Sequence, residues 1–123
     1  MARRNSGGPK YPRSARVGET LREIIAEDLV RFDDERLSFV SITGIDVDPE
    51  LNRAIVFFDS LEGEDGDEEI IEALAEYRVR LQSSIARQIK AKKTPILEFR
   101  PDVAIRSSER IDEILRADRE RRS

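Results

Sequence analysis

The feature that most limits the fold of this chain is a long stripe of apolar residues at helical spacing. The stripe begins at Ile70 and ends at Ile89, with members three or four residues apart. At about 100° per residue, Arg78 falls inside the stripe and Val79 falls opposite it. The pattern therefore fits two structures equally well. Either a kink or break near residues 77–79 divides the segment into two helices, or one helix continues and the Arg78 side chain extends outward.

The sign of the charge also reverses along this segment. From Glu62 to Glu76 there are eight acidic residues and no basic one, whereas from Arg78 to Lys93 there are six basic residues and no acidic one. The whole chain is acidic, with 26 Asp and Glu against 22 Lys and Arg. Positive charge gathered in one place on an acidic protein indicates an anionic partner, typically a nucleic-acid backbone. The predicted contact residues are Arg78, Arg80, Arg87, Lys90, Lys92 and Lys93.

Other polar groups could support the same contact. The neutral hydrogen-bond donors nearby are Gln82, Ser83, Ser84 and Gln88. Four arginines at the start of the chain are predicted accessory contacts: Arg3, Arg4, Arg13 and Arg16. The few aromatic residues occupy positions patterned for the core, so base stacking is not expected to dominate. Binding through charge should weaken steeply as salt rises.

The remaining pattern predicts an α+β domain with three strands and helices covering one face of the sheet. Helices are expected at about 15–32, from Asp67 through the long stripe, and briefly after Ser107 or Ser108. Strands are expected at about 38–47, 53–59 and 96–99, the first two joined by a turn as an antiparallel hairpin. The predicted organisation is a flexible basic arm (1–13), one domain (14–116) and a frayed charged tail (117–123).

Composition excludes several classes of function. The chain has no cysteine and no histidine, so it lacks disulfides, thiolate metal sites, and the commonest general base and metal ligand. It also has no apolar run of about 18 residues, the length that crosses a membrane. We therefore expect a cytoplasmic, non-enzymatic binding protein without a cofactor or metal. The alternatives are a protein–protein adaptor that docks a basic partner on the acidic block 62–76, and a hydrolase that binds its metal through carboxylates alone.

Four segments of the chain resemble the ribosome-binding factor A family. The first helix begins with Arg16-Val17, and Asp34-Glu35-Arg36-Leu37 precedes the strand at 41–47. Residues 48–57 continue the match, and residues 95–102 carry a P-x-L-x-F-x-x-D pattern. A helix containing Glu109-Arg110-Ile111 and Ile114-Leu115 follows. The resemblance covers about residues 15–116, in the order and spacing of the family.

The resemblance implies a type II KH-like domain, α-β-β-α-α-β, with no catalytic activity. It implies a monomer that binds rRNA of the free, immature small ribosomal subunit and assists late maturation near the rRNA 3′ end, with other maturation factors as further partners. Members help cells at low temperature. The family's helix–kink–helix is centred on Ala-x-Gly, which falls here on Tyr77-Arg78-Val79, so the chain lacks both family residues. The basic residues after that point match the family's basic face.

Overall fold

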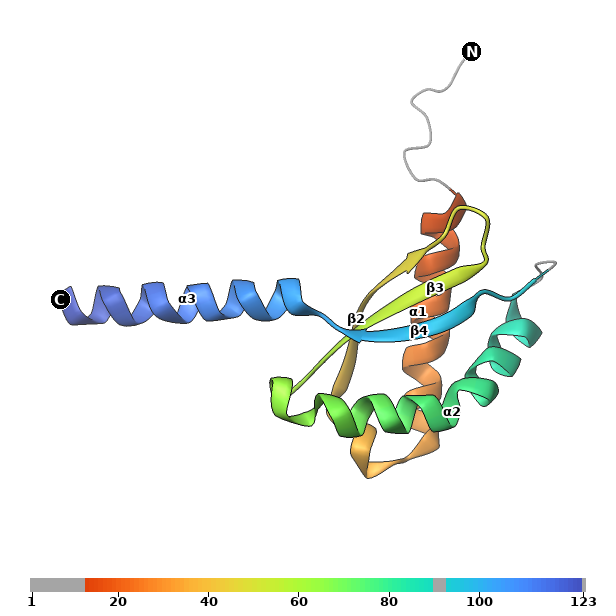
Figure 1. Cartoon of the computed structure of the whole chain (residues 1–123), viewed down its shortest axis with the longest axis horizontal. Helices are drawn as coiled ribbons and strands as arrows, with labels where there is room; N and C mark the ends of the chain where they lie inside the picture. Colours follow the sequence, from red (N-terminus) through yellow and green to blue (C-terminus); the bar gives the residue numbers. More distant parts are fainter. Residues whose placement is uncertain (1–12, 90–92, 123) are drawn as a thin grey trace, which may run out of the picture.

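The computed structural model describes residues 13–89 and 93–122. Its elements follow the order helix, two strands, helix, strand, helix, with two short 3₁₀ turns (Figure 1). In chain order they are α1 (Arg13–Phe32), η1 (Glu35–Leu37), β2 (Val40–Val47), β3 (Arg53–Ser60), η2 (Gly63–Gly66), α2 (Asp67–Gln88), β4 (Ile96–Pro101) and α3 (Val103–Arg122). The predicted α+β class and all three predicted strands are confirmed.

The three strands form one mixed sheet in the order β2-β3-β4. β2 and β3 are antiparallel, as the short turn between them predicted, whereas β3 and β4 are parallel. A parallel pair needs a crossover connection, and α2 supplies it. The β2–β3 register shifts between Ile42 and Gly44, which leaves Thr43 outside the ladder as a bulge.

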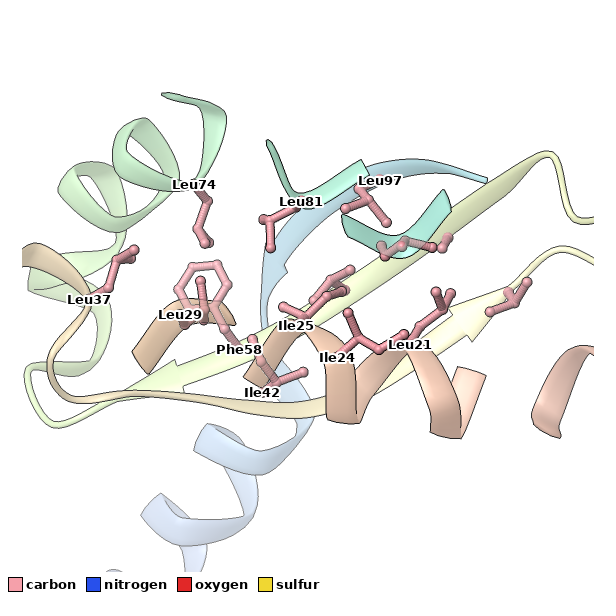
Figure 2. Close-up of a cluster of buried hydrophobic side chains, with 14 of the residues drawn as sticks. Leu21, Ile24, Ile25, Leu29, Leu37, Ile42, Phe58, Leu74, Leu81 and Leu97 are labelled. Atoms are coloured by element: carbon pink, nitrogen blue, oxygen red, sulfur yellow. The ribbon is translucent and has the colours of Figure 1, made fainter. Parts of the chain in front are cut away.

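Helices α1 and α2 cover one face of this sheet. Alternate residues of the central strand, Ala54, Val56 and Phe58, are fully buried on that face. Figure 2 shows the Phe58 ring among side chains from both helices, including Leu29 of α1 and Leu74 of α2. The helical stripes predicted from apolar spacing therefore meet in one core, as expected.

Helix α2 is continuous from Asp67 to Gln88, but it changes direction partway along its length (Figure 1). Arg78 is exposed and Val79 is 75 % exposed. The helix is therefore unbroken at residues 77–79 with Arg78 exposed, so the predicted break into two helices does not occur, whereas a kink at these residues stays a prediction. The bend does not carry Val79 into the core, because Tyr77 and Leu81 already occupy the buried side of the stripe.

Helix α3 differs most from the prediction. It begins at Val103 rather than near Ser107, because Asp102 caps it by accepting a hydrogen bond from the Ile105 backbone N–H (3.0 Å). It continues to Arg122, so the described part of the predicted frayed tail, 117–122, is helical. The helix projects away from the domain and has no buried residue (Figure 1). Since no core holds it, apolar spacing could not define its length.

Candidate nucleic-acid interface

The second half of α2 presents Arg80 and Arg87 on the same side of the helix. They are seven residues apart, which is about two turns, so their side chains leave the helix in nearly the same direction. Both are exposed, while Ser84 between them is buried. Within residues 13–89 and 93–122, neither arginine forms an ion pair. Their charge is therefore available to an external anion.

Arg78 lies on the opposite edge of α2. It lines a hollow with Ile96 and Phe99 of β4, whereas Arg80 lies beside Phe32 of α1. The structure therefore separates Arg78 from the other two arginines. The face of α2 between these two edges, which we call the ridge, carries small or uncharged side chains that line a shallow hollow together with Arg78 and Thr94: Val79, Gln82, Ser83 and Ala86. Short side chains there allow a ligand backbone to approach the helix closely.

Aromatic rings hold the Arg80 guanidinium in place. Its Cζ lies 4.8 Å from the ring centroid of Phe32 and 5.3 Å from that of Tyr77. The two rings stack on each other with centroids 4.1 Å apart and an interplanar angle of 7°. A cation near aromatic rings is attracted by their electron density, so Arg80 is oriented before any ligand arrives.

A polar cluster fixes the middle of α2 to the loop after α1. The Tyr77 hydroxyl donates to Asp34 Oδ2 (2.9 Å). The Arg36 guanidinium donates to Asp34 Oδ2 (2.7 Å) and to both carboxylate oxygens of Glu76 (2.8 and 2.9 Å). Hydrogen bonds from Arg36 hold the pKa of Asp34 well below its usual range and also lower the pKa of Glu76. The hydrogen bond to the Asp34 carboxylate raises the pKa of Tyr77.

This cluster explains how acidic and basic residues can adjoin on one helix. Glu76 is the last acid before the basic half, and Arg36 pairs with it. The positive field around Arg80 is therefore less opposed by the nearest carboxylate of its own helix. Reasoning from the sequence missed this cluster, because its members come from two separated segments. Only Asp34 and Arg36, where the helical pattern of α1 stops, gave a signal in the sequence.

Of the other predicted contact residues, the structure describes the side chains of only two, Lys93 and Arg16. Lys93 is exposed and its Nζ donates to Asn52 Oδ1 (2.5 Å), beside the turn of the hairpin. Arg16 is exposed on α1. Arg3, Arg4, Lys90, Lys92 and the side chain of Arg13 lie outside the described residues.

Two of the predicted neutral donors, Ser84 and Gln88, form a hydrogen bond with each other. Ser84 is buried and accepts a hydrogen bond from Gln88 Nε2 (3.0 Å), so the expectation that Ser84 faces a ligand is wrong. Gln82 and Ser83 instead line the hollow on the ridge of α2.

Comparisons with known proteins place the chain in a family. The family model described as "Ribosome-binding factor A" matches residues 13–115. A relative of that name from Rubrobacter xylanophilus is 35 % identical over 105 residues, which cover 85 % of each chain. Another from Methylobacterium nodulans is 37 % identical over 121 residues, covering 95 % of this chain and 88 % of the relative. This chain belongs to the ribosome-binding factor A family.

Solved structures of ribosome-binding factor A agree in fold. The crystal structure of the Thermus thermophilus protein superposes with a TM-score of 0.65 at 24 % identity, covering 72 % of this chain and 94 % of that one. A T. thermophilus homology model fitted into a cryo-EM map of a complex between the 30S subunit and ribosome-binding factor A gives a TM-score of 0.59 at 24 % identity. The superposed region covers 71 % of this chain and 92 % of the T. thermophilus model. The expected KH-like fold is thereby confirmed.

Within this member of the ribosome-binding factor A family, Tyr77, Arg78 and Val79 lie inside a bent but unbroken helix. Here the aromatic stack and the bond to Asp34 fix Tyr77. No group of three or more possible metal-ligating side chains occurs in the described part of the chain. None of the described helices has the length and apolar character needed to cross a membrane.

Proposed function

We propose that this protein is a non-catalytic assembly factor that binds the immature small ribosomal subunit and assists late maturation of its rRNA near the 3′ end. Membership of the ribosome-binding factor A family supports the proposal. The T. thermophilus member has been fitted into a map of its complex with the 30S subunit. The main support for an rRNA contact is the basic second half of α2, which is exposed. Its Arg80 and Arg87 have no ion-pair partner among the described residues.

The geometry favours a phosphate backbone as the ligand. Arg78 on one edge of α2 and Arg80 with Arg87 on the other flank the ridge of small side chains. An arginine fork donates paired hydrogen bonds to phosphate oxygens, so each edge can bind one strand segment. Ser83 and Gln82 can add neutral donors to phosphate or ribose. Lys93 with Lys90 and Lys92 would extend the contact, and Arg3, Arg4, Arg13 and Arg16 would be accessory to it.

The test is to replace Arg78, Arg80 and Arg87 with alanine together. We expect weaker binding to immature small subunits and a salt dependence less steep by about 0.7–0.9 in log K per log salt for each phosphate that the variant no longer binds. Binding is measured by filter retention at several salt concentrations. The matched control replaces Arg110, Arg116 and Arg121, three exposed arginines of α3, which projects away from the domain (Figure 1), and should leave the slope unchanged. An unchanged affinity and slope in the triple variant would contradict this site.

The cellular role needs a separate measurement. Sucrose-gradient sedimentation of lysate, with detection of the protein, should find it with free small subunits and not with translating ribosomes. In a strain that lacks the protein, precursor ends of the small-subunit rRNA should accumulate. Co-migration only with translating ribosomes would refute an assembly role even if the rRNA contact on α2 is correct.

A further inference from the structure

A groove lies at the opposite end of α2 from its basic half. It is formed by the end of the β2–β3 hairpin, η2 and the first half of α3, and it has a volume of about 750 Å³. Figure 1 places α3 and the start of α2 on one side of the molecule and the end of α2 on the other. The basic surface proposed for rRNA does not extend to this groove, so an occupant of the groove would be a separate ligand.

The walls of the groove are held firmly together. Arg106 of α3 donates to Asp59 Oδ1 at the end of β3 (2.8 Å) and to both carboxylate oxygens of Asp67 at the start of α2 (2.7 and 2.9 Å). Thr43, released from the ladder by the bulge in β2, donates to Asp102 Oδ2 just before α3 (2.5 Å). These bonds fix the first turn of α3 to the rest of the domain, so the groove is a built feature.

Large apolar side chains line the groove and remain exposed. Phe39 and Leu61 directly adjoin the paired residues Val40 and Ser60, so both lie at the open end of the hairpin and line the groove there. They are 69 % and 79 % exposed, and Val103 across the groove is 67 % exposed. An aromatic ring and two aliphatic side chains gathered in one hollow are typical of an interaction surface, although each alone would be unremarkable.

The charge around these apolar residues is acidic. Glu62 and Glu64 come from the loop and η2, and Glu109 and Glu113 come from α3. Arg106 is already paired with two carboxylates, so among the lining residues only Arg110 remains as a basic counterpart. A phosphate backbone or an anionic membrane surface would be repelled here. A basic segment would be attracted, and its apolar side chains could cover Phe39 and Leu61.

We propose that this groove docks a Lys/Arg-rich segment of a partner protein, anchored by one or two large apolar side chains against Phe39, Leu61 and Val103. The four carboxylates set the charge of the partner and the apolar residues set its position. The inference does not depend on the rRNA contact, because no residue of the basic half of α2 lines the groove.

The test is a titration of the full-length ¹⁵N-labelled protein, followed by NMR and by fluorescence anisotropy of the probe. The probe is an eight-residue peptide with Phe and Leu at its centre and three Lys or Arg on each side. Three control ligands are a peptide with Ser in place of Phe and Leu, a peptide with Glu in place of the basic residues, and a single-stranded RNA. We expect shifts at Phe39, Leu61 and α3 with the first peptide, and none there with the RNA or the acidic peptide.

Variants separate charge from packing. Glu109→Lys with Glu113→Lys should weaken peptide binding about tenfold, since two exposed attractions become repulsions. Phe39→Ser should weaken it about fivefold or more by removing an apolar contact. The matched controls are Glu68→Lys with Glu72→Lys on the exposed side of α2, and Val30→Ser, which removes an exposed apolar side chain from α1. Neither control should change binding by more than about twofold.

Three results would overturn the proposal. The Ser-substituted peptide could bind as tightly as the probe, which would indicate general charge attraction and not a docking groove. The RNA could shift the same resonances, which would assign the groove to nucleic acid. The protein alone could form a concentration-dependent dimer that Glu109→Lys with Glu113→Lys abolishes, which would assign the groove to a second copy of the chain.

Discussion

Replacing Arg106 with alanine should destabilise the protein far more than its place on an unburied helix suggests. The side chain is only 16 % exposed and makes three charge-assisted hydrogen bonds to Asp59 and Asp67. These bonds raise the pKa of Arg106, with the contact to Asp67 contributing most. Without the guanidinium, two carboxylates remain close together with little access to water. Exposed pairs contribute up to about 1 kcal/mol and loss of one partner of a buried pair costs about 3–5 kcal/mol, so we expect about 2–3 kcal/mol for this intermediate case.

The measurement is urea unfolding followed by circular dichroism, with a thermal scan beside it. For a domain of this size the expected loss corresponds to a decrease in Tm of roughly 10 °C. Arg110→Ala, an exposed arginine one turn further along α3, should change the free energy of unfolding by less than about 0.5 kcal/mol. In a double-mutant cycle of Arg106→Ala with Asp67→Asn, the second change should restore part of the loss. Equal effects of the Arg106 and Arg110 variants would refute the reasoning.

Two further predictions concern the middle of α2. The pKa values of Asp34 and Glu76 are lowered from their ordinary values of 3.8 and 4.5, so the stability that they contribute is present above those values and is lost as the pH falls below about 4.5. Thermal scans from pH 6 to pH 3 should therefore show a smaller decrease in Tm for Arg36→Met than for the unmodified protein, and parallel curves would contradict the pairing. Leu81→Ala should cost about 2–5 kcal/mol in urea unfolding and Val79→Ala less than about 0.5 kcal/mol, because Leu81 is buried and Val79 is not. Equal losses would show that the helix is rotated from the position described.

Much of the fold could be predicted because local periodicity and burial agree in it. Alternate burial of Ala54, Val56 and Phe58 follows from the strand period, and the stripe of α2 follows from the helical period. The parallel pairing of β4 with β3 could not be predicted in this way. It depends on where α2 returns the chain, which no short window of sequence encodes.

The candidate site was less predictable, because it depends on contacts between distant segments. Helical spacing placed Arg78 apart from Arg80 and Arg87, yet the sequence could not show that Phe32 and Tyr77 orient Arg80. Likewise the start of α3 followed from a side-chain cap at Asp102 and from the ion pair of Arg106, and not from an apolar stripe. Polar contacts between elements carry no periodicity, and so residue spacing does not reveal them.

The parallel pairing of β3 with β4 has a consequence for the order in which the protein folds. The β2–β3 hairpin closes through a short turn and can form early, because its contacts are local. β4 can join the sheet only after the chain has passed through the whole of α2 and the loop that follows it. The last strand to pair is therefore the one that follows the basic end of α2. A nascent chain that still ends within α2 can form the β2–β3 hairpin but leaves the β4 edge of β3 unpaired, so that edge stays open until synthesis has passed Pro101.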